Sequence, residues 1–184
     1  MGKLGTNDAD YPLTQLVGGK RVKCPFYSTW YNMMYRCYSG KKASYKGCSV
    51  HPEWHSFMNF RSWMEKQDWE GKHLDKDLMF EGNKIYSEVT CVFISEEVNK
   101  FMPDCKSVRG DYPVGVYFDK SVGKYKSQCR VKGTYKHIGL FDSVQDACQA
   151  YSLFKYGLAV ELALKQEDER VSQALINKYK PKPH

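Results

Sequence analysis

The sequence has no long apolar run. Nowhere does it approach the roughly 20 consecutive apolar residues that a membrane-spanning helix needs. Residues 1–19 also lack the apolar segment of a secretory signal. We therefore expect no membrane partner and no export, which places the protein in the cytoplasm. Hydrophobic residues still make up 42% of the chain, so we expect a folded core rather than extended disorder.

Closely spaced cysteine pairs are missing as well. The chain has seven cysteines, but none of them form the C-x-x-C spacing of a zinc knuckle or ribbon. An odd number of cysteines without a secretory signal is typical of reduced thiols. We expect these side chains to act as small buried apolar groups.

Acidic residues are scarce in one segment. The net charge is +7, from 28 basic and 21 acidic residues. Residues 107–184 contribute +5 of this charge, and the excess lies between residues 109 and 137. The basic residues of that segment are Arg109, Lys120, Lys124, Lys126, Arg130, Lys132 and Lys136. Such a patch is either an ordinary solvated face or a surface for a polyanion such as nucleic acid.

Apolar periodicity organises the first half of the chain. Residues 1–20 are expected to be a loose lead-in. Apolar residues at three- and four-residue steps predict a helix that begins at Pro25 and a second helix over residues 57–64. Residues 73–80 and 85–95 predict two strands joined by the turn E-G-N-K. A short helix is expected to follow, with Ser95 as its N-cap.

The second half has a different pattern. The two prolines and one glycine of residues 102–113 indicate a linker. Three short strands are predicted over residues 114–118, 124–131 and 134–141. A helix is expected to begin after Ser143, since Asp146 lies at the capping-box position.

The middle strand of this group is polar on one face. Alternation places Tyr125, Ser127, Cys129 and Val131 on one side and Lys126, Gln128, Arg130 and Lys132 on the other. The first set suits packing against the helix. The second set carries the groups that contact base edges and phosphates, although a soluble sheet with a polar outer face would show the same alternation.

Several elements of this region occur together at defined spacings. They are Gly115-Val116, Gly123-Lys124-Tyr125, Ser127-Gln128-Cys129-Arg130, Ile138-Gly139-Leu140-Phe141-Asp142 and the stretch from Ala147 to Tyr151. Together they resemble the DNA-binding domain of plant ethylene-response factors, the Apetala-two type. The resemblance implies a sheet in the major groove of double-stranded DNA. The DNA-facing residues that it implies are Tyr117, Gln128, Arg130, Tyr135 and His137. Lys126 joins that face by strand alternation alone. The family has more arginines and tryptophans there, so its base preference does not transfer.

A polar cluster in the first half suggests metal chemistry. In a strand, His73, Asp75 and Asp77 would lie on one face, and Asn99 follows on the short helix. Carboxylate and amide oxygens suit a hard cation such as Mg²⁺. Such an ion neutralises the charge that develops on a scissile phosphate. The alternative is an ordinary solvated strand end.

A longer pattern surrounds this cluster. It consists of W-x-x-M-x-x-x-C from Trp30, then Val50, Trp54, Phe57 and Phe60, then L-D-K-D, Y-S-E-V-T-C-V-F-I and E-E-V-N. The pattern resembles phage HNH-type endonucleases, which often carry an appended Apetala-type domain. The resemblance implies a ββα element that binds one Mg²⁺ or Mn²⁺ ion through Asp75 and Asn99. Thr90 stands at the position of the central asparagine, and Lys76 stands at that of the general-base histidine. A protonated lysine cannot accept a proton, so His73 or Asp77 would have to activate the water.

We therefore expect an α+β protein in three parts. Residues 1–105 would form an HNH-like ββα module with added helices, and residues 106–162 a three-stranded antiparallel sheet packed on one helix. Residues 163–184 would form a charged helical extension and tail. The expected function is metal-dependent nicking or cleavage of double-stranded DNA by a homing-like phage endonuclease in the bacterial host, with no small-molecule substrate.

Two alternatives remain open. The first is a catalytically inactive HNH-scaffold DNA-binding protein that acts as a regulator or host-interference factor, which Lys76 and Thr90 favour. The second is a protein that binds a host enzyme through its aromatic side chains, which make up 15% of the chain.

Overall fold

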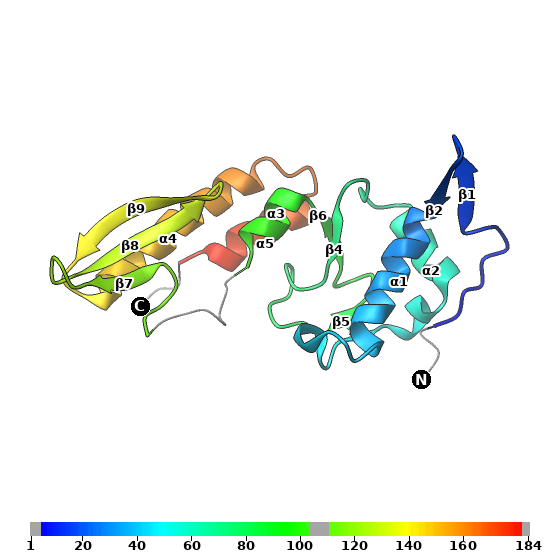
Figure 1. Cartoon of the computed structure of the whole chain (residues 1–184), viewed down its shortest axis with the longest axis horizontal. Coiled ribbons are helices and arrows are strands. Elements are labelled where there is room, and N and C mark those ends of the chain that lie inside the picture. Colours follow the sequence, from blue (N-terminus) through cyan, green and yellow to red (C-terminus); the bar gives the residue numbers. More distant parts are fainter. Residues whose placement is uncertain (1–4, 104–110, 182–184) are drawn as a thin grey trace. The chain divides into compact units, whose positions relative to one another are not determined.

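The chain forms two compact units, Met1–Glu96 and Glu97–His184, each of mixed α+β structure (Figure 1). The computed structural model describes residues 5–103 and 111–181. The division between the units falls after the first residue of the short helix that follows Ser95, whereas the sequence places the boundary at residue 105. None of the described helices is long and apolar enough to cross a membrane.

The first unit is built around an aromatic core. Helix α1 (Pro25–Tyr38) begins at Pro25 as predicted, and α2 (Phe57–Met64) is capped by Ser56, whose hydroxyl accepts a hydrogen bond from the Asn59 amide. Both helices bury the apolar residues that recur at helical spacing. The buried members are Trp30, Met33, Met34, Phe57, Phe60, Trp63 and Met64. The predicted core helices are therefore confirmed.

The remaining elements of the first unit are short. Strands β3 (Ser49–Val50) and β5 (Ile85–Tyr86) pair in parallel, and β4 (His73–Asp75) pairs antiparallel with β6 (Val92–Ile94). Two 3₁₀ turns are η1 (Ala43–Tyr45) and η2 (Pro52–His55). The predicted strand over residues 73–80 ends at Asp75, and the one over residues 85–95 is interrupted by a turn between β5 and β6.

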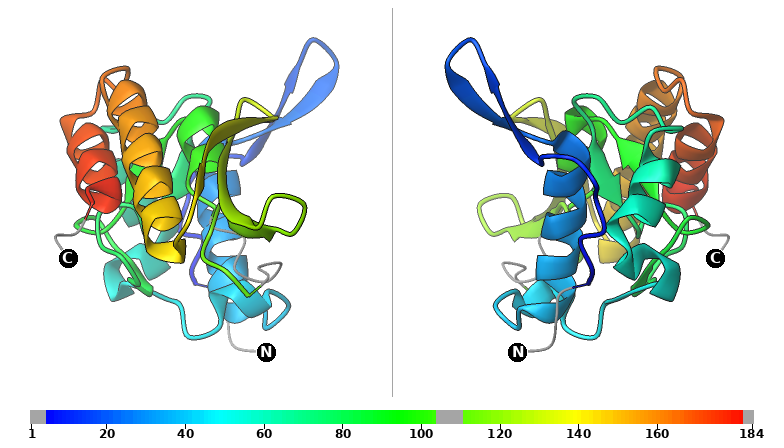
Figure 2. Two further views of the ribbon diagram at one scale, coloured as in Figure 1. Left: turned by 90° about the vertical axis from the view of Figure 1, so that its left-hand side faces the viewer. Right: turned by 90° about the vertical axis from the view of Figure 1, so that its right-hand side faces the viewer.

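The expected lead-in is not entirely a loop. Strands β1 (Thr14–Val17) and β2 (Lys20–Lys23) form an antiparallel hairpin. Figure 2 shows it projecting beyond the helices of the first unit. Its turn, Gly18–Gly19, has positive φ at both positions, the conformation that a two-residue hairpin requires.

The second unit begins with α3 (Glu96–Phe101), whose first residue closes the first unit. Strands β7 (Val116–Asp119), β8 (Lys124–Val131) and β9 (Thr134–Phe141) then form an antiparallel sheet in the order β7-β8-β9. Helix α4 (Val144–Ala163) packs across one face of it. The capping box at Ser143 is present, because the Ser143 hydroxyl accepts from the Asp146 amide at 3.1 Å. The three-stranded sheet and its helix are therefore as predicted.

The charged C-terminal segment was expected to be a solvated extension. Instead, α5 (Glu169–Tyr179) packs against α4. Asp168 caps it by accepting the Arg170 amide at 2.9 Å, and Val171 and Leu175 are fully buried. Helix α5 therefore contributes Val171 and Leu175 to the core of the second unit.

Candidate functional site

The sheet of the second unit has one covered face and one open face. Ser127 and Cys129 are buried on the side of α4. Because successive side chains of a strand point to opposite faces, Lys126, Gln128 and Arg130 lie on the side away from the helix. The predicted division of β8 into a core face and a polar face matches this burial pattern.

The six residues predicted to face DNA lie opposite one another in the sheet. The register pairs Tyr117 with Lys126, Gln128 with His137, and Arg130 with Tyr135. Directly opposed residues of an antiparallel sheet share a face, so these three cross-strand pairs form one surface, which we call the open face. All six side chains are exposed or half-buried, with Tyr135 64% exposed.

The cations of the open face lie near aromatic rings. The Lys126 ammonium is 5.8 Å from the centre of the Tyr117 ring, and the Arg130 guanidinium is 5.9 Å from that of Tyr135. Both distances are within the range of a cation–π interaction. These contacts restrict two long side chains to the surface of the sheet.

Arg130 keeps most of its donors available. Its Nε donates to the Gly133 carbonyl at 3.2 Å, across the two-residue turn Lys132–Gly133. Within the described residues its terminal nitrogens have no hydrogen-bond partner. A guanidinium held at Nε presents these terminal groups in a fixed orientation, which suits a planar acceptor such as guanine.

A bulge in β9 shapes the open face. Gln128 pairs with His137 but Ser127 pairs with Gly139, so Ile138 is an additional residue in β9. A bulge of one residue reverses the alternation beyond it. Both His137 and Leu140 consequently lie on the open face, and Leu140 is 43% exposed. Sequence reasoning missed Leu140, because strict alternation assigns it to the helix side.

The other predicted basic residues are dispersed. Lys124 forms an ion pair with Asp142 at 3.1 Å, and the Lys136 ammonium lies 5.2 Å from the Phe154 ring on the side of α4. Lys120 and Lys132 lie in the turns at the two ends of β8, and Arg109 lies outside the described residues. Of the described basic residues in this segment, only Lys126 and Arg130 therefore lie on the open face.

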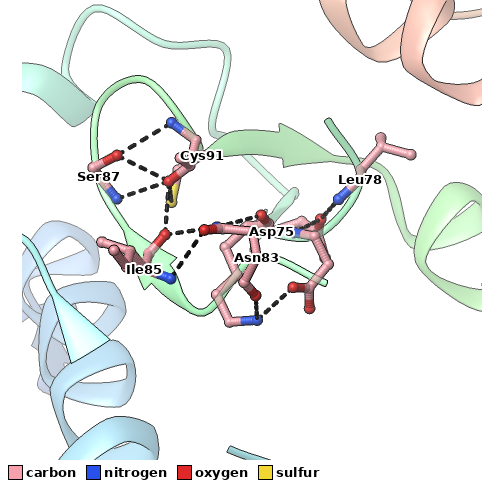
Figure 3. A network of polar contacts seen from close by, with 9 residues as sticks. Asp75, Leu78, Asn83, Ile85, Ser87 and Cys91 are labelled. Atoms are coloured by element: carbon pink, nitrogen blue, oxygen red, sulfur yellow. Dashed lines mark hydrogen bonds and ion pairs between the residues drawn. The ribbon is translucent and has the colours of Figure 1, made fainter. Parts of the chain in front are cut away.

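The cluster around Asp75 has a clear structural role. Asp75 Oδ1 accepts the backbone amides of Asp77 at 2.9 Å and Leu78 at 2.7 Å (Figure 3). This carboxylate thus ends β4 and closes the turn that follows. Burial raises the pKa of Asp75, while the two backbone hydrogen bonds act in the opposite direction.

Lys76 is buried, with only 4% of its surface exposed. Its ammonium donates to Asp77 Oδ1 at 2.5 Å and to the Asn83 carbonyl at 3.0 Å. It also lies 5.6 Å from the centre of the Tyr86 ring. Lys76 therefore holds the loop between β4 and β5.

Asn83 and Thr90 complete this network. Asn83 Nδ2 donates to the carbonyls of Lys76 at 2.8 Å and Ile85 at 2.7 Å, and its Oδ1 accepts the Ile85 amide. Thr90 Oγ1 donates to the same Ile85 carbonyl at 2.7 Å (Figure 3). The sequence predicted residues 81–84 as a turn, but it gave no signal for the hydrogen bonds of the Asn83 side chain.

The predicted catalytic and metal residues do not all share one element. His73 is exposed on β4, on the same strand face as Asp75. Asp77 was predicted on that strand face but lies beyond the end of β4. Asn99 is exposed on α3 in the second unit, whereas Asp75 belongs to the first.

The carboxylates around Asp75 are already bound in part by donors of the protein. The described residues contain no group of three or more histidine, cysteine, aspartate or glutamate side chains that could hold a metal ion. Asp77 Oδ1 is bound to the Lys76 ammonium, which competes with a cation for that carboxylate. Asp75 Oδ2 is left as the carboxylate oxygen without a hydrogen bond to the described residues.

Comparison with protein-family models, curated proteins and solved structures finds no match to this chain. The two resemblances noted in the sequence therefore stay predictions.

Proposed function

We propose that the chain binds double-stranded DNA and docks the open face of the β7–β9 sheet in the major groove. The observation that carries this proposal is the set of three cross-strand pairs on one exposed face, Tyr117–Lys126, Gln128–His137 and Arg130–Tyr135. Three strands spaced about 4.8 Å apart are about 10 Å wide, which fits a groove about 12 Å wide.

The side chains of this face have complementary tasks. Arg130 presents donors to a guanine edge, and Gln128 offers both a donor and an acceptor to an adenine edge. Lys126 supplies a positive charge for a phosphate, a contact that fixes position rather than sequence. Leu140 offers an apolar contact to a thymine methyl group.

The test is a selection of duplexes from a random pool, followed by affinity measurements with two variants. Arg130→Ala should reduce discrimination between selected and unselected duplexes by about 1–3 kcal/mol. Lys120→Ala, in the exposed turn between β7 and β8, should weaken binding to all duplexes alike. Equal losses for both variants on every duplex would remove the base-contact role, and failure to enrich any duplex would remove DNA binding.

A second candidate function is that of an HNH-type endonuclease that uses Mg²⁺ or Mn²⁺. The observation that favours it is the antiparallel pair of β4 and β6, which precedes α3 in the chain order β4, β5, β6, α3. Asp75 ends β4, and Asn99 lies on α3. His73 would serve as the general base in this reading.

Asp75→Asn separates the nuclease from its inactive counterpart. The amide oxygen can still accept the amides of Asp77 and Leu78, so the turn should survive, but the charge that a divalent ion requires is lost. Plasmid that carries a selected site should be nicked by the wild-type protein with Mg²⁺ or Mn²⁺ and left intact by this variant. A wild-type protein that binds the site without nicking it would be the inactive HNH-scaffold regulator. The contacts of the Lys76 ammonium with Asp77 and the Asn83 carbonyl favour this alternative.

A further inference from the structure

The hairpin formed by β1 and β2 is exposed along its whole length. All eight of its strand residues are solvent-exposed, and Leu16 is 74% exposed. The Cys24 amide donates to the Leu13 carbonyl at 2.8 Å and closes the base of the hairpin. Both residues pack against the core of the first unit, and α1 begins at the next residue, Pro25. The hairpin is thus an arm with a fixed attachment (Figure 1).

This arm lies in a stretch without acidic residues. Residues 11–52 contain seven lysines and arginines and no aspartate or glutamate. Three of these cations, Lys20, Arg21 and Lys23, belong to β2. None of the three forms an ion pair within the described part of the chain. The average over residues 1–106, which is close to neutral, hides this local excess.

Both faces of the arm combine a cation with an aliphatic side chain. The register pairs Leu16 with Arg21 and Val17 with Lys20, so neither face is purely polar. An isolated two-stranded hairpin is marginally stable in water. Exposed aliphatic groups beside unpaired cations therefore indicate a partner that is anionic and also offers apolar surface. Duplex DNA meets both conditions through its phosphates and the base edges of its grooves.

We propose that the β1–β2 hairpin is a second DNA-binding element, an arm that places Lys20, Arg21 and Lys23 against phosphates and its aliphatic side chains at a groove. A two-stranded ribbon is narrow enough to enter the major groove, and arms with apolar side chains also enter minor grooves. This inference rests on the proposed DNA-binding function, but it concerns the first unit rather than the sheet of the second.

The test compares two triple variants of the full-length chain with the same net charge. Lys20→Ser/Arg21→Ser/Lys23→Ser removes the cations of the arm, and Lys66→Ser/Lys84→Ser/Lys178→Ser removes three exposed lysines elsewhere. Duplex affinity is measured by fluorescence anisotropy over a series of salt concentrations. Each phosphate contact contributes about 0.9 to the slope of log K against log salt, so the arm variant should lose about 2–3 units of slope. The control variant should lose far less.

Two further variants keep the outcomes distinct. Arg21→Ser alone should lower the slope by about 0.9, which guards against a folding defect in the triple variant. If the arm variant and the control variant have the same slope while Arg130→Ala still impairs binding, the arm inference is wrong and the proposed function stands. If the wild-type chain binds no duplex at all, both fail together.

Discussion

At the scale of single residues, Ser127 is an anomaly in the covered face of the sheet. It is completely buried, and its hydroxyl has no hydrogen-bond partner among the described residues. A buried polar group without a partner costs about 1–3 kcal/mol. Ser127→Ala should therefore leave the free energy of unfolding unchanged or raise it by about 1 kcal/mol in urea denaturation.

Ser143→Ala is the matched control for this prediction, because it removes a serine hydroxyl that does have a role. It deletes the N-cap of α4 and should lower the free energy of unfolding by about 1 kcal/mol. If Ser127→Ala destabilises the protein as much as Ser143→Ala does, the Ser127 hydroxyl must be bonded.

Individual residues also show where prediction from the sequence stops. Asp75 could be recognised as an important carboxylate, but its main contacts are to backbone amides, which the sequence does not reveal. Lys76 was expected to be protonated and unable to accept a proton, and nothing in the sequence indicated its burial, since lysine is rarely buried. Its burial depends on the path of the loop that brings the Asn83 carbonyl to its ammonium.

At the scale of elements, α5 gives the clearest prediction. Val171 and Leu175 lie one helical turn apart and are both buried against α4. Leu175→Ala should lower the free energy of unfolding by about 2–5 kcal/mol, because it removes buried methyl groups and leaves a cavity. Leu164→Ala, at a residue 80% exposed, should change it by no more than about 0.5 kcal/mol.

Thermal or urea unfolding of the two leucine variants decides between a core helix and the solvated extension expected from the sequence. Similar stabilities for both variants would show that α5 is a solvated extension and not part of the core. A larger loss for Leu175→Ala would show that the C-terminal segment stabilises the unit that carries the open face.

The sequence predicted elements well where periodicity and turns agreed. Strands β8 and β9 occupy the predicted residues, because the turns at Gly123 and Gly133 fix their ends. Helix α5 was predicted as a helix, but as a solvated one, because its charge density concealed the spacing of Val171 and Leu175. The β1–β2 hairpin was missed although Gly18–Gly19 is a hairpin signal, since exposed strands show no clean alternation of apolar and polar residues. No pattern predicted the bulge at Ile138.

At the scale of the whole molecule, the division between the units differs from the predicted one for a physical reason. Proline and glycine content indicated a linker after α3. In the structure, α3 packs within the second unit: the Phe101 ring meets the Tyr179 ring edge to face at 5.1 Å, and Lys155 donates to the Phe101 carbonyl at 3.0 Å. Composition identifies flexible sequence, but tertiary contacts decide which unit a short helix joins.

These contacts predict how the second unit behaves when it is produced alone. A fragment of residues 95–184 retains α3, and a fragment of residues 111–184 loses it together with the contacts of Phe101 to Tyr179 and Lys155. The shorter fragment should unfold at a lower temperature, because burial of an aromatic side chain contributes about 1.5–3 kcal/mol. Circular dichroism during heating measures this difference.

Phe101→Ala in the longer fragment is the control and should reproduce most of the loss. Equal melting temperatures for the two fragments would show that the contacts of Phe101 with Tyr179 and Lys155 do not stabilise the second unit.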